Sequence, residues 1–342
     1  MKNNFELGIT TFAEIMENPE TGETISYDER IRQVVDEIVF ADELGLSYFG
    51  VGEHHRKDFA SSAPHIILAA AASKTQNITL GSAVTVLSSD DPVRVFQNFA
   101  TINAISHGRA EILAGRGSFT ESFPLFGYDL NDYDDLYKEK LNLLINIRDN
   151  EIVDHDGQLR PSIDLLGVYP RPSEPLTIAL ASGGSRGSVI RAARLGLPLF
   201  LAIIGGEPLR FKPLVELYDR VYEAEGHDPA KRFVSIHSHG YITDDKEKAF
   251  EEYYPSIEPM MSRIGKERGW GPYSRRVYNH ALSMEGALYV GDPQYVAEKI
   301  NYLRDNMNIN RFALHVPVGY MDHEKVLKTI ELLAKEVKPK LQ

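Results

Sequence analysis

Short apolar runs alternate with longer amphipathic stretches along most of the chain. Apolar runs bounded by turn residues are typical of buried parallel strands, and the stretches between them have the spacing of helices that cover a sheet. Eight runs are predicted to be strands. They are Glu6–Phe12, Tyr48–Glu53, Ile78–Val86, Ala110–Gly115, Leu176–Ala181, Pro198–Ile204, Phe233–Ile242 and Arg311–Val318.

Helix boundaries are marked by capping residues. Tyr27–Leu44 has apolar residues at helical spacing, follows Ser26 as an N-cap, and stops at Gly45. Similar signals predict helices at Pro92–Ile105 and from Asp292-Pro293 through Asn306. A further helix is expected at Asp132–Arg148.

Eight strands with helices between them in 342 residues predict a (β/α)8 TIM barrel. An open doubly wound sheet is less favoured, because no G-x-G-x-x-G sequence follows any strand. Residues 118–175 and 243–291, after the fourth and seventh strands, exceed what a barrel connection needs and are typical of lids or substrate-binding loops. Without a linker sequence, residues 1–342 are expected to form one domain.

Composition excludes several classes of function. The net charge is −12 and we find no basic cluster, which disfavours nucleic acid as a partner. The chain has no cysteine, which excludes disulfides, thiolate nucleophiles and cysteine-ligated metals. Neither a signal peptide nor an apolar run of membrane-spanning length is recognised, so we expect a cytoplasmic protein that does not associate with membranes.

The fourth predicted strand ends in an arginine between two glycines. In AEILAGRGS, residues 110–118, Arg116 is followed by Gly117, and glycine lets the backbone approach a ligand closely. Strand ends meet at one face of a barrel, so this pattern predicts a cation at the mouth of a cleft. A tight turn with a surface arginine is the alternative.

The fifth strand leads into a glycine-rich turn. Gly183 and Gly184 precede a helix that runs through Arg194, so backbone N–H groups and the helix dipole could bind an anion, and the hydroxyls of Ser185 and Ser188 could assist. Ordinary capping of the helix by serine explains the same residues.

Two histidines follow the second strand. On an extended segment His54 and His55 point to opposite faces, so at most one faces the cleft. A neutral imidazole there suits proton transfer, or donation to a carbonyl or peroxide oxygen. A metal site is disfavoured, because adjacent histidines rarely share a metal. Alternatively the histidines lie on a surface loop where Glu53 pairs with Arg56.

Three further patterns have more than one interpretation. His237 and His239 share one face of a strand, which is either the barrel interior or the side that meets the helices. Small residues after Gly81 suit a buried strand, or a flat ring lying against the backbone. An aromatic run is expected to pack within the first insertion, with one or two rings covering a ligand. Its members are Phe119, Phe123, Phe126, Tyr128, Tyr133 and Tyr137.

Taken together, these motifs resemble those of the bacterial luciferase-like flavin-dependent monooxygenases. The matching segments are GVGEHH at 50–55, SAVTVLSSDDPVRVFQNFATINAISHGRAEILAGRGS at 82–118, ASGGS at 181–185 and GALYVGDPQYVAEKI at 286–300. The segment at 82–118 is the most specific, because several motifs occur there in one order and at one spacing. The chain looks closest to a branch of uncharacterised oxidoreductases.

The resemblance implies a barrel that holds FMN at the carboxyl ends of its strands, often as a homodimer. It further implies that a separate NAD(P)H:flavin reductase supplies reduced FMN, which reacts with O2 to oxidise a small organic substrate. His54 matches the family's pocket histidine and is the implied catalytic residue. The implied cofactor-binding residues are Ala83 and Val84, where the family often has a non-prolyl cis peptide, Arg116, Gly117, and the phosphate loop Ser182, Gly183, Gly184, Ser185 and Ser188.

Three rival functions stay open. They are a deazaflavin (F420) dehydrogenase of the same superfamily, a non-catalytic flavin-binding protein, and a phosphosugar-processing barrel. One departure from the family is Gly184, where some relatives have a glutamate or another polar residue, so backbone N–H groups would carry more of the phosphate contact. The insertions lie largely outside the matching segments, which leaves the substrate undetermined.

Overall fold

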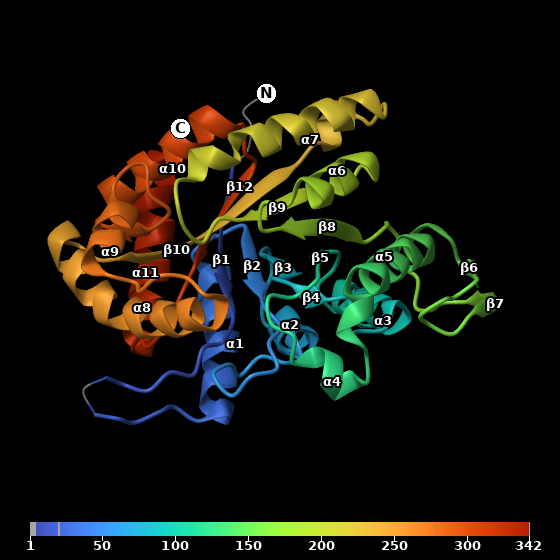
Figure 1. The fold of residues 1–342 in the computed structure, drawn as a ribbon, viewed down its shortest axis with the longest axis horizontal. Coiled ribbons are helices and arrows are strands. Elements are labelled where there is room, and N and C mark those ends of the chain that lie inside the picture. The colour runs from blue at the N-terminus through green and yellow to red at the C-terminus, as the bar shows by residue number, and fades with distance from the viewer. Residues whose placement is uncertain (1–4, 20, 342) are drawn as a thin grey trace.

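Parallel strands close into a barrel in the computed structural model, which describes residues 5–19 and 21–341 (Figure 1). Around the barrel the order is β1 (Glu6–Thr11), β2 (Tyr48–Val51), β3 (Thr79–Ser82), β5 (Ala110–Gly115), β8 (Thr177–Ser182), β9 (Leu199–Ala202), β10 (Val234–Ile242) and β12 (Arg311–His315). The circle closes because β12 pairs with β1, from Glu6 opposite Arg311 to Thr10 opposite His315. The predicted (β/α)8 barrel is confirmed.

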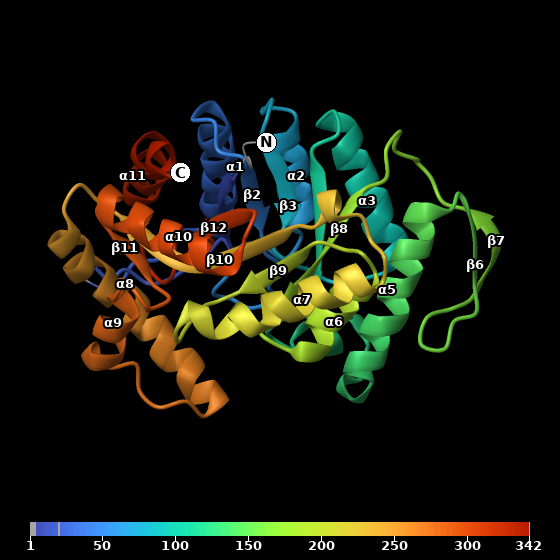
Figure 2. The same cartoon turned by 90° about the horizontal axis from the view of Figure 1, so that it is seen from above.

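Helices follow the barrel strands and form the outer layer (Figure 2). They are α1 (Tyr27–Glu43), α2 (Pro64–Ala72), α3 (Pro92–Ile105), α5 (Tyr133–Asp149), α6 (Arg186–Arg194), α7 (Lys212–Ala224), α10 (Pro293–Met307) and α11 (His323–Leu332). The expected ends of α1 are confirmed, since Ser26 Oγ accepts the Glu29 N–H at 3.2 Å and Gly45 has φ of +76°. Short helical turns of the 3-10 or π type are also present in the described chain, at residues 130–132, 208–211, 229–231, 333–337 and 338–340.

The third strand is interrupted, where the apolar run predicted one strand over Ile78–Val86. It consists of β3 and the two-residue β4 (Thr85–Val86), separated by a cis peptide bond between Ala83 and Val84. The first part pairs with β2 and β5, whereas β4 pairs with β5 alone. The apolar pattern contains no signal for a change of peptide geometry, so the prediction of one unbroken strand is wrong. The non-prolyl cis peptide that the family resemblance implied at Ala83–Val84 is confirmed.

Both predicted insertions are present. The first contains α4 (Ser122–Phe126), α5 and an antiparallel hairpin of β6 (Ile152–His155) and β7 (Ile163–Gly167), which extends away from the barrel in Figure 1. The second contains α8 (Lys246–Arg268), α9 (Arg275–Leu282) and β11 (Tyr289–Gly291). Because β11 pairs with the end of β10, this insertion is attached to the carboxyl-end side of the barrel.

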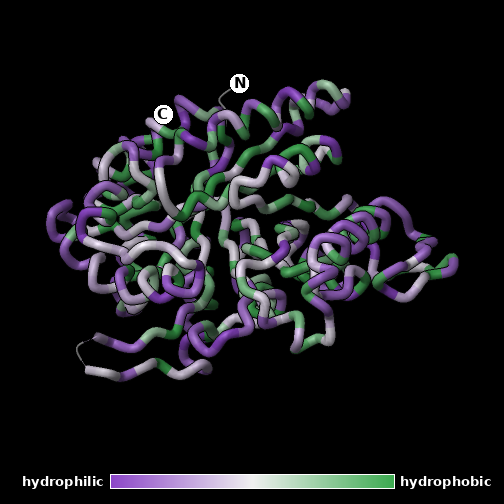
Figure 3. The backbone as a smooth tube through the Cα atoms, in the orientation of Figure 1, coloured by the Kyte–Doolittle hydropathy of each residue, from purple (hydrophilic) through white to green (hydrophobic). Residues whose placement is uncertain are grey.

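The interior of the barrel is filled below its mouth. Tyr48, Leu113 and Phe200 form a buried cluster, and a Cβ at Gly81 would lie 2.5 Å from the Tyr48 hydroxyl oxygen, so glycine is required beside this ring. At the amino ends of the strands Arg311 contacts Glu111 at 2.8 Å. Figure 3 shows apolar residues along the central strands and polar ones over much of the outer helices. The free space inside the barrel is therefore at the carboxyl ends.

Candidate active site

A cavity of about 190 Å³ opens among the carboxyl ends of the barrel strands. Its lining comes from β5, β8, β9 and β10 and from segments that follow several strands. The lining residues are Phe12, Glu53, His54, Ala83, Val84, Leu113, Gly115, Arg116, Gly117, Ser118, Tyr133, Ala181, Ser182, Gly183, Phe200, Ala202 and His237. Ligand sites of this fold lie at this face.

Most of the residues singled out from the sequence meet in this cavity. His54, Ala83, Val84, Arg116, Gly117, Ser182 and Gly183 all line it. Gly184, Ser185 and Ser188 are absent from its lining. Gly184 belongs to the turn after β8, Ser185 is the N-cap of α6, and Ser188 lies in the first turn of that helix. Ser185 Oγ accepts the Ser188 N–H at 3.5 Å, so this serine acts as the N-cap of α6.

His54 is held in an aromatic cage. Its backbone N–H donates to the Ser61 carbonyl at 2.8 Å, and its ring centroid lies 4.5, 4.4 and 5.1 Å from those of Phe12, Phe59 and Phe119. Nε2 is buried and has no hydrogen-bond partner among the described residues. Burial, with smaller effects from neighbouring charges, lowers the pKa of His54 to about 3. The imidazole is therefore neutral near pH 7 and keeps an unused nitrogen beside the cavity.

The neighbouring residues Glu53 and His55 support the strand end. His55 Nε2 lies 2.9 Å from Glu53 Oε1, while Glu53 Oε2 accepts the Val86 N–H at 2.9 Å. Glu53 thus ties the segment after β2 to β4, just beyond the cis peptide. Arg56 pairs instead with carboxylates of Glu121 and Glu267. The alternative in which Glu53 pairs with Arg56 on a surface loop is wrong.

Arg116 reaches the cavity rim from the end of β5. Its guanidinium lies 2.7 Å from the Asp134 carboxylate and 5.5 Å from the centre of the Tyr133 ring, and about one third of the side chain is exposed. An exposed ion pair of this kind contributes at most about 1 kcal/mol. Arg116 can therefore exchange Asp134 for an anionic ligand at low cost.

Small residues shape the rim of the cavity. A Cβ added at Gly183 would meet no protein atom within 4 Å, so open space lies directly over this backbone. A Cβ at Gly115 would fall 2.6 Å from a Val84 methyl carbon, so β5 and the cis peptide lie in close contact. Ser182 Oγ accepts the Gly184 N–H at 3.2 Å and orders the turn. Backbone and small side chains thus leave open space at the rim of a cavity that His54 and Arg116 also line.

The strand pattern predicted two possible orientations for His237 and His239. Both side chains are buried inside the barrel, because His237 lines the cavity and His239 lies 5.4 Å, ring to ring, from His315. Desolvation, with repulsion from His315, lowers the pKa of both well below 6.5. His315 was missed, although the alternation Arg311, Ala313, His315 of an inward face could have indicated it.

Phe12 and Phe200 were also missed as lining residues. Both lie in or next to predicted strands, where an aromatic residue is expected to be core, so the sequence carried no separate signal for them. Of the aromatic run in the first insertion, Tyr133 lines the cavity and Phe119 contacts His54. Phe123 and Tyr137 are buried, which fits the expected packing role.

Within the described parts of the chain, no cluster of three or more His, Asp or Glu side chains is arranged to hold a metal ion. The helices in residues 5–19 and 21–341 include none that is both long and apolar enough to cross a membrane.

The fold is a (β/α)8 barrel, and its cavity lies at the carboxyl ends of the strands, the face at which enzymes of this fold have their active sites. The chain belongs to the luciferase-like monooxygenase family, whose model matches residues 5–307. The resemblance read from the sequence motifs is confirmed.

Similar proteins extend over almost the whole chain. N-acetyl-S-alkylcysteine monooxygenase of Bacillus subtilis is 26% identical over 326 residues, covering 89% of this chain and 92% of that protein. An uncharacterized protein of Sinorhizobium fredii is 23% identical over 326 residues, covering 91% and 92%. The chain is thus related to oxidoreductases of the monooxygenase type.

Solved structures show the same fold. A Streptomyces bottropensis monooxygenase superposes with a TM-score of 0.82 at 20% identity, covering 98% of this chain and 100% of the other. The oxygenating component of a Pseudomonas putida 3,6-diketocamphane monooxygenase, solved with FMN, gives 0.79 at 20% identity and covers 99% of each chain. An F420-dependent secondary alcohol dehydrogenase gives 0.73 at 17% identity, with 99% of each chain covered.

Proposed function

We propose that this protein is an FMN-dependent monooxygenase that uses reduced FMN and O2 to oxidise a small organic substrate. One observation carries the proposal: His54, the Ala83–Val84 peptide, Arg116 and the Ser182–Gly183 turn line one cavity. Family membership and the FMN bound to the structurally similar camphane monooxygenase support this choice of cofactor. Reduced FMN supplies the electrons that activate O2 when it is bound.

The residues around the cavity fit a flavin. The open space over Gly183, in a cavity that Val84 also lines, can admit a planar ring, and the buried, unpartnered His54 Nε2 offers it a polar contact. Sites for whole ligands usually measure about 300–1,000 Å³. A cavity of about 190 Å³ would therefore enclose the ring alone. We assign the ribityl phosphate to the open side, over Gly183 and near the amino end of α6.

His54 acts as a neutral hydrogen-bonding group in this proposal. An efficient general base has a pKa near the working pH, whereas burial lowers the pKa of His54 to about 3. Its role is therefore to donate to, or accept from, a ligand oxygen, while its aromatic cage excludes water. Arg116 would neutralise negative charge on the ring edge or phosphate.

Two further parts of the proposal rest on family resemblance. We propose that a separate NAD(P)H:flavin reductase delivers reduced FMN, and that the protein works as a homodimer in the cytoplasm. Oxidation of NAD(P)H coupled to product formation only when a reductase is added would support the first part. A dimeric mass by light scattering would support the second.

Titration of the purified protein with oxidised FMN and with F420 tests the cofactor. We expect saturable quenching of FMN fluorescence and no response to F420. Binding of F420 alone, together with hydride transfer that consumes no O2, would instead establish the deazaflavin dehydrogenase, which the F420-dependent structural relative keeps as the second candidate.

Two outcomes would reject both enzymes. FMN binding without any reductase-linked oxidation would identify a non-catalytic flavin-binding protein. Binding of neither cofactor would leave the phosphosugar-processing barrel.

A further inference from the structure

A line of buried hydrogen bonds leads from the cavity to a second pocket. His237 Nδ1 lies 2.8 Å from Thr10 Oγ1, which lies 3.1 Å from His315 Nδ1. His315 Nε2 in turn lies 2.9 Å from Glu14 Oε1. These four side chains, here called the relay, are each at most 4% exposed.

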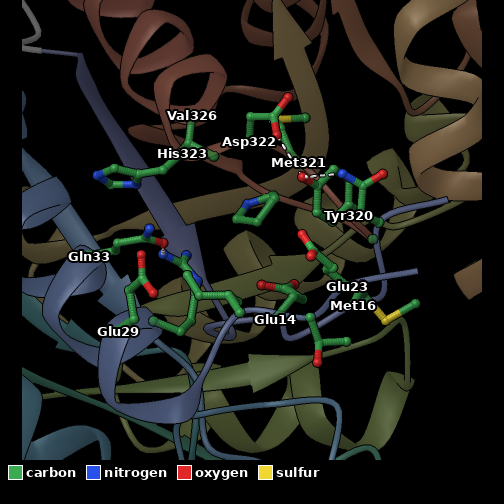
Figure 4. A pocket seen from close by; sticks show the side chains of 16 residues that line it. Glu14, Met16, Glu23, Glu29, Gln33, Tyr320, Met321, Asp322, His323 and Val326 are labelled. Atoms are coloured by element: carbon green, nitrogen blue, oxygen red, sulfur yellow. Dashed lines mark hydrogen bonds between the residues drawn. The ribbon is translucent and has the colours of Figure 1, made fainter. Parts of the chain in front are cut away.

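The two ends of the relay face different spaces. His237 lines the proposed flavin cavity. Glu14 lines a second pocket of about 320 Å³, formed by the segments after β1 and β12 and the start of α1. Figure 4 shows the Glu14 carboxylate among the side chains of this pocket, which include Glu29 and His323.

Strand register brings the relay together. In the order β10, β12, β1, Thr10 pairs directly with His315, and His237 is opposite Ala313, one inward position lower. Inward-facing side chains on neighbouring strands are close enough to bond, so the Thr10 hydroxyl lies between the two imidazoles. The Glu14 carboxylate lies above His315, where Thr11 Oγ1 also donates to it at 3.4 Å.

The relay has two hydrogen arrangements that satisfy every member. With Glu14 as a carboxylate, His315 donates through Nε2 and accepts the Thr10 hydroxyl at Nδ1, so Thr10 must accept from His237 Nδ1–H. In the reverse arrangement, a protonated Glu14 donates to His315 Nε2 and each following bond is inverted. Burial and the charge of neighbouring histidines lower the pKa of His237, which favours its neutral ring in both.

We propose that the relay conducts protons between the flavin cavity and the second pocket. A proton leaves an N–H or O–H of the bound ligand and joins His237 Nε2. Nδ1 of that ring passes its proton to the Thr10 oxygen, and the Thr10 proton moves to His315 Nδ1. His315 Nε2 releases its proton to Glu14, which discharges it to water in the second pocket. One proton enters and one leaves, and no imidazole keeps a charge. The two imidazoles then carry their protons on the opposite nitrogens, so both tautomers must return to the first arrangement before the next proton is conducted.

This inference rests on the proposed function for the identity of the ligand, but the relay can be tested in the ligand-free protein. Histidine selectively labelled with ¹⁵N reports by NMR which ring nitrogen carries the proton. We expect His237 protonated on Nδ1 and His315 on Nε2. Substitution T10V keeps the shape and removes the hydroxyl, so His237 should lose its Nδ1–H form, whereas T10S should retain it. A wild-type His237 protonated on Nε2, or an unchanged tautomer in T10V, would overturn the proposal.

Turnover with reduced FMN provides the second readout. We expect T10V and E14Q to slow it by about 10-fold or more and to alter the solvent deuterium isotope effect, with FMN affinity unchanged within about twofold. T10S and the control E29Q, whose exposed carboxylate lines the second pocket outside the relay, should stay close to the parent. Equal rates for T10V and T10S would contradict proton conduction. Failure to bind FMN would instead contradict the proposed function and leave the tautomer result standing.

Discussion

His54 is buried among aromatic rings and has an unpartnered Nε2, an arrangement that suits contact with a ligand better than structural support. We expect His54→Ala to leave FMN affinity nearly intact and to lower turnover by about 10²–10³, the usual cost of losing one hydrogen-bonding group that contacts the reacting atoms. Steady-state rates with reduced FMN, beside an FMN titration, measure both quantities. His107→Asn is a matched control, since His107 is exposed at a positive φ that asparagine tolerates. Full activity in His54→Ala would remove this residue from the proposed mechanism.

Gly183 tests the position of the cofactor at the scale of one residue. Its backbone has ordinary φ and open space over the missing Cβ, so Gly183→Leu should fold normally and fill the space assigned to FMN. We expect FMN to bind at least about 10-fold more weakly, with little change in the free energy of unfolding. Gly205→Leu is the control, because Gly205 is also exposed with open space but lies outside the cavity. Equal FMN affinity of the two variants would place the cofactor elsewhere.

At the scale of elements, a buried lysine joins the second insertion to the barrel. Lys299 on α10 donates to the carbonyls of Leu282 at 3.2 Å, Ser283 at 2.6 Å and Leu288 at 2.6 Å. These acceptors lie at the end of α9 and before β11. Desolvation lowers the pKa of Lys299 to about 7, so the hydrogen bonds to the three carbonyls are the main reason for a lysine here.

We expect Lys299→Met to destabilise the protein by about 1–3 kcal/mol, because it leaves these buried carbonyls without their donor. Urea unfolding gives the free energy difference. Lys266→Met on the exposed face of α8 removes an equivalent side chain that makes no such contacts with the residues the structure describes, and should change stability by less than about 0.5 kcal/mol. Similar losses in both variants would indicate that the charge itself, and not the carbonyl contacts, matters.

The histidines at the barrel mouth affect the whole molecule through the pH dependence of stability. Burial lowers the pKa of His54 to about 3 and that of His237 and His239 well below 6.5. The unfolded chain binds these protons near pH 6.5 and the folded chain does not, so stability is present above that pH and falls as the pH drops. Burial raises the pKa of Asp90 to about 6, so this one carboxyl group stabilises the folded protein as the pH falls and offsets part of the loss caused by the histidines.

We therefore expect a net loss on the order of 3 kcal/mol of unfolding free energy between about pH 6.5 and 5. Most carboxylates titrate below this range, at about pH 4, and contribute little to the change. Urea unfolding at several pH values measures the slope. His54→Gln removes one of the histidines whose pKa is lowered by burial and should make the slope shallower. A flat profile would show that these rings are charged in the folded state.

The sequence by itself determined the fold class, because buried parallel strands and amphipathic helices have different apolar periods and capping residues mark where each begins. It also indicated where chemistry lies, since Arg116, His54 and Gly183 each follow a strand, and strand ends converge in a barrel. The matching segments also indicated the protein family. The order and spacing of residues along the chain are enough for these inferences.

Tertiary structure decided what depends on contacts between distant segments. The cis peptide at Ala83–Val84, which the apolar pattern does not indicate and only the family resemblance implied, divides the third strand. The barrel register turned His237 inward and brought it next to Thr10, which is 227 positions away along the chain. The same register brought His315, on the neighbouring strand β12, to the other side of the Thr10 hydroxyl. Burial lowered the pKa of His54, although nothing in its neighbours along the chain implies an aromatic cage. Hydrogen bonding and desolvation depend on which side chains are in contact in the folded protein, and the closure of the barrel determines those contacts.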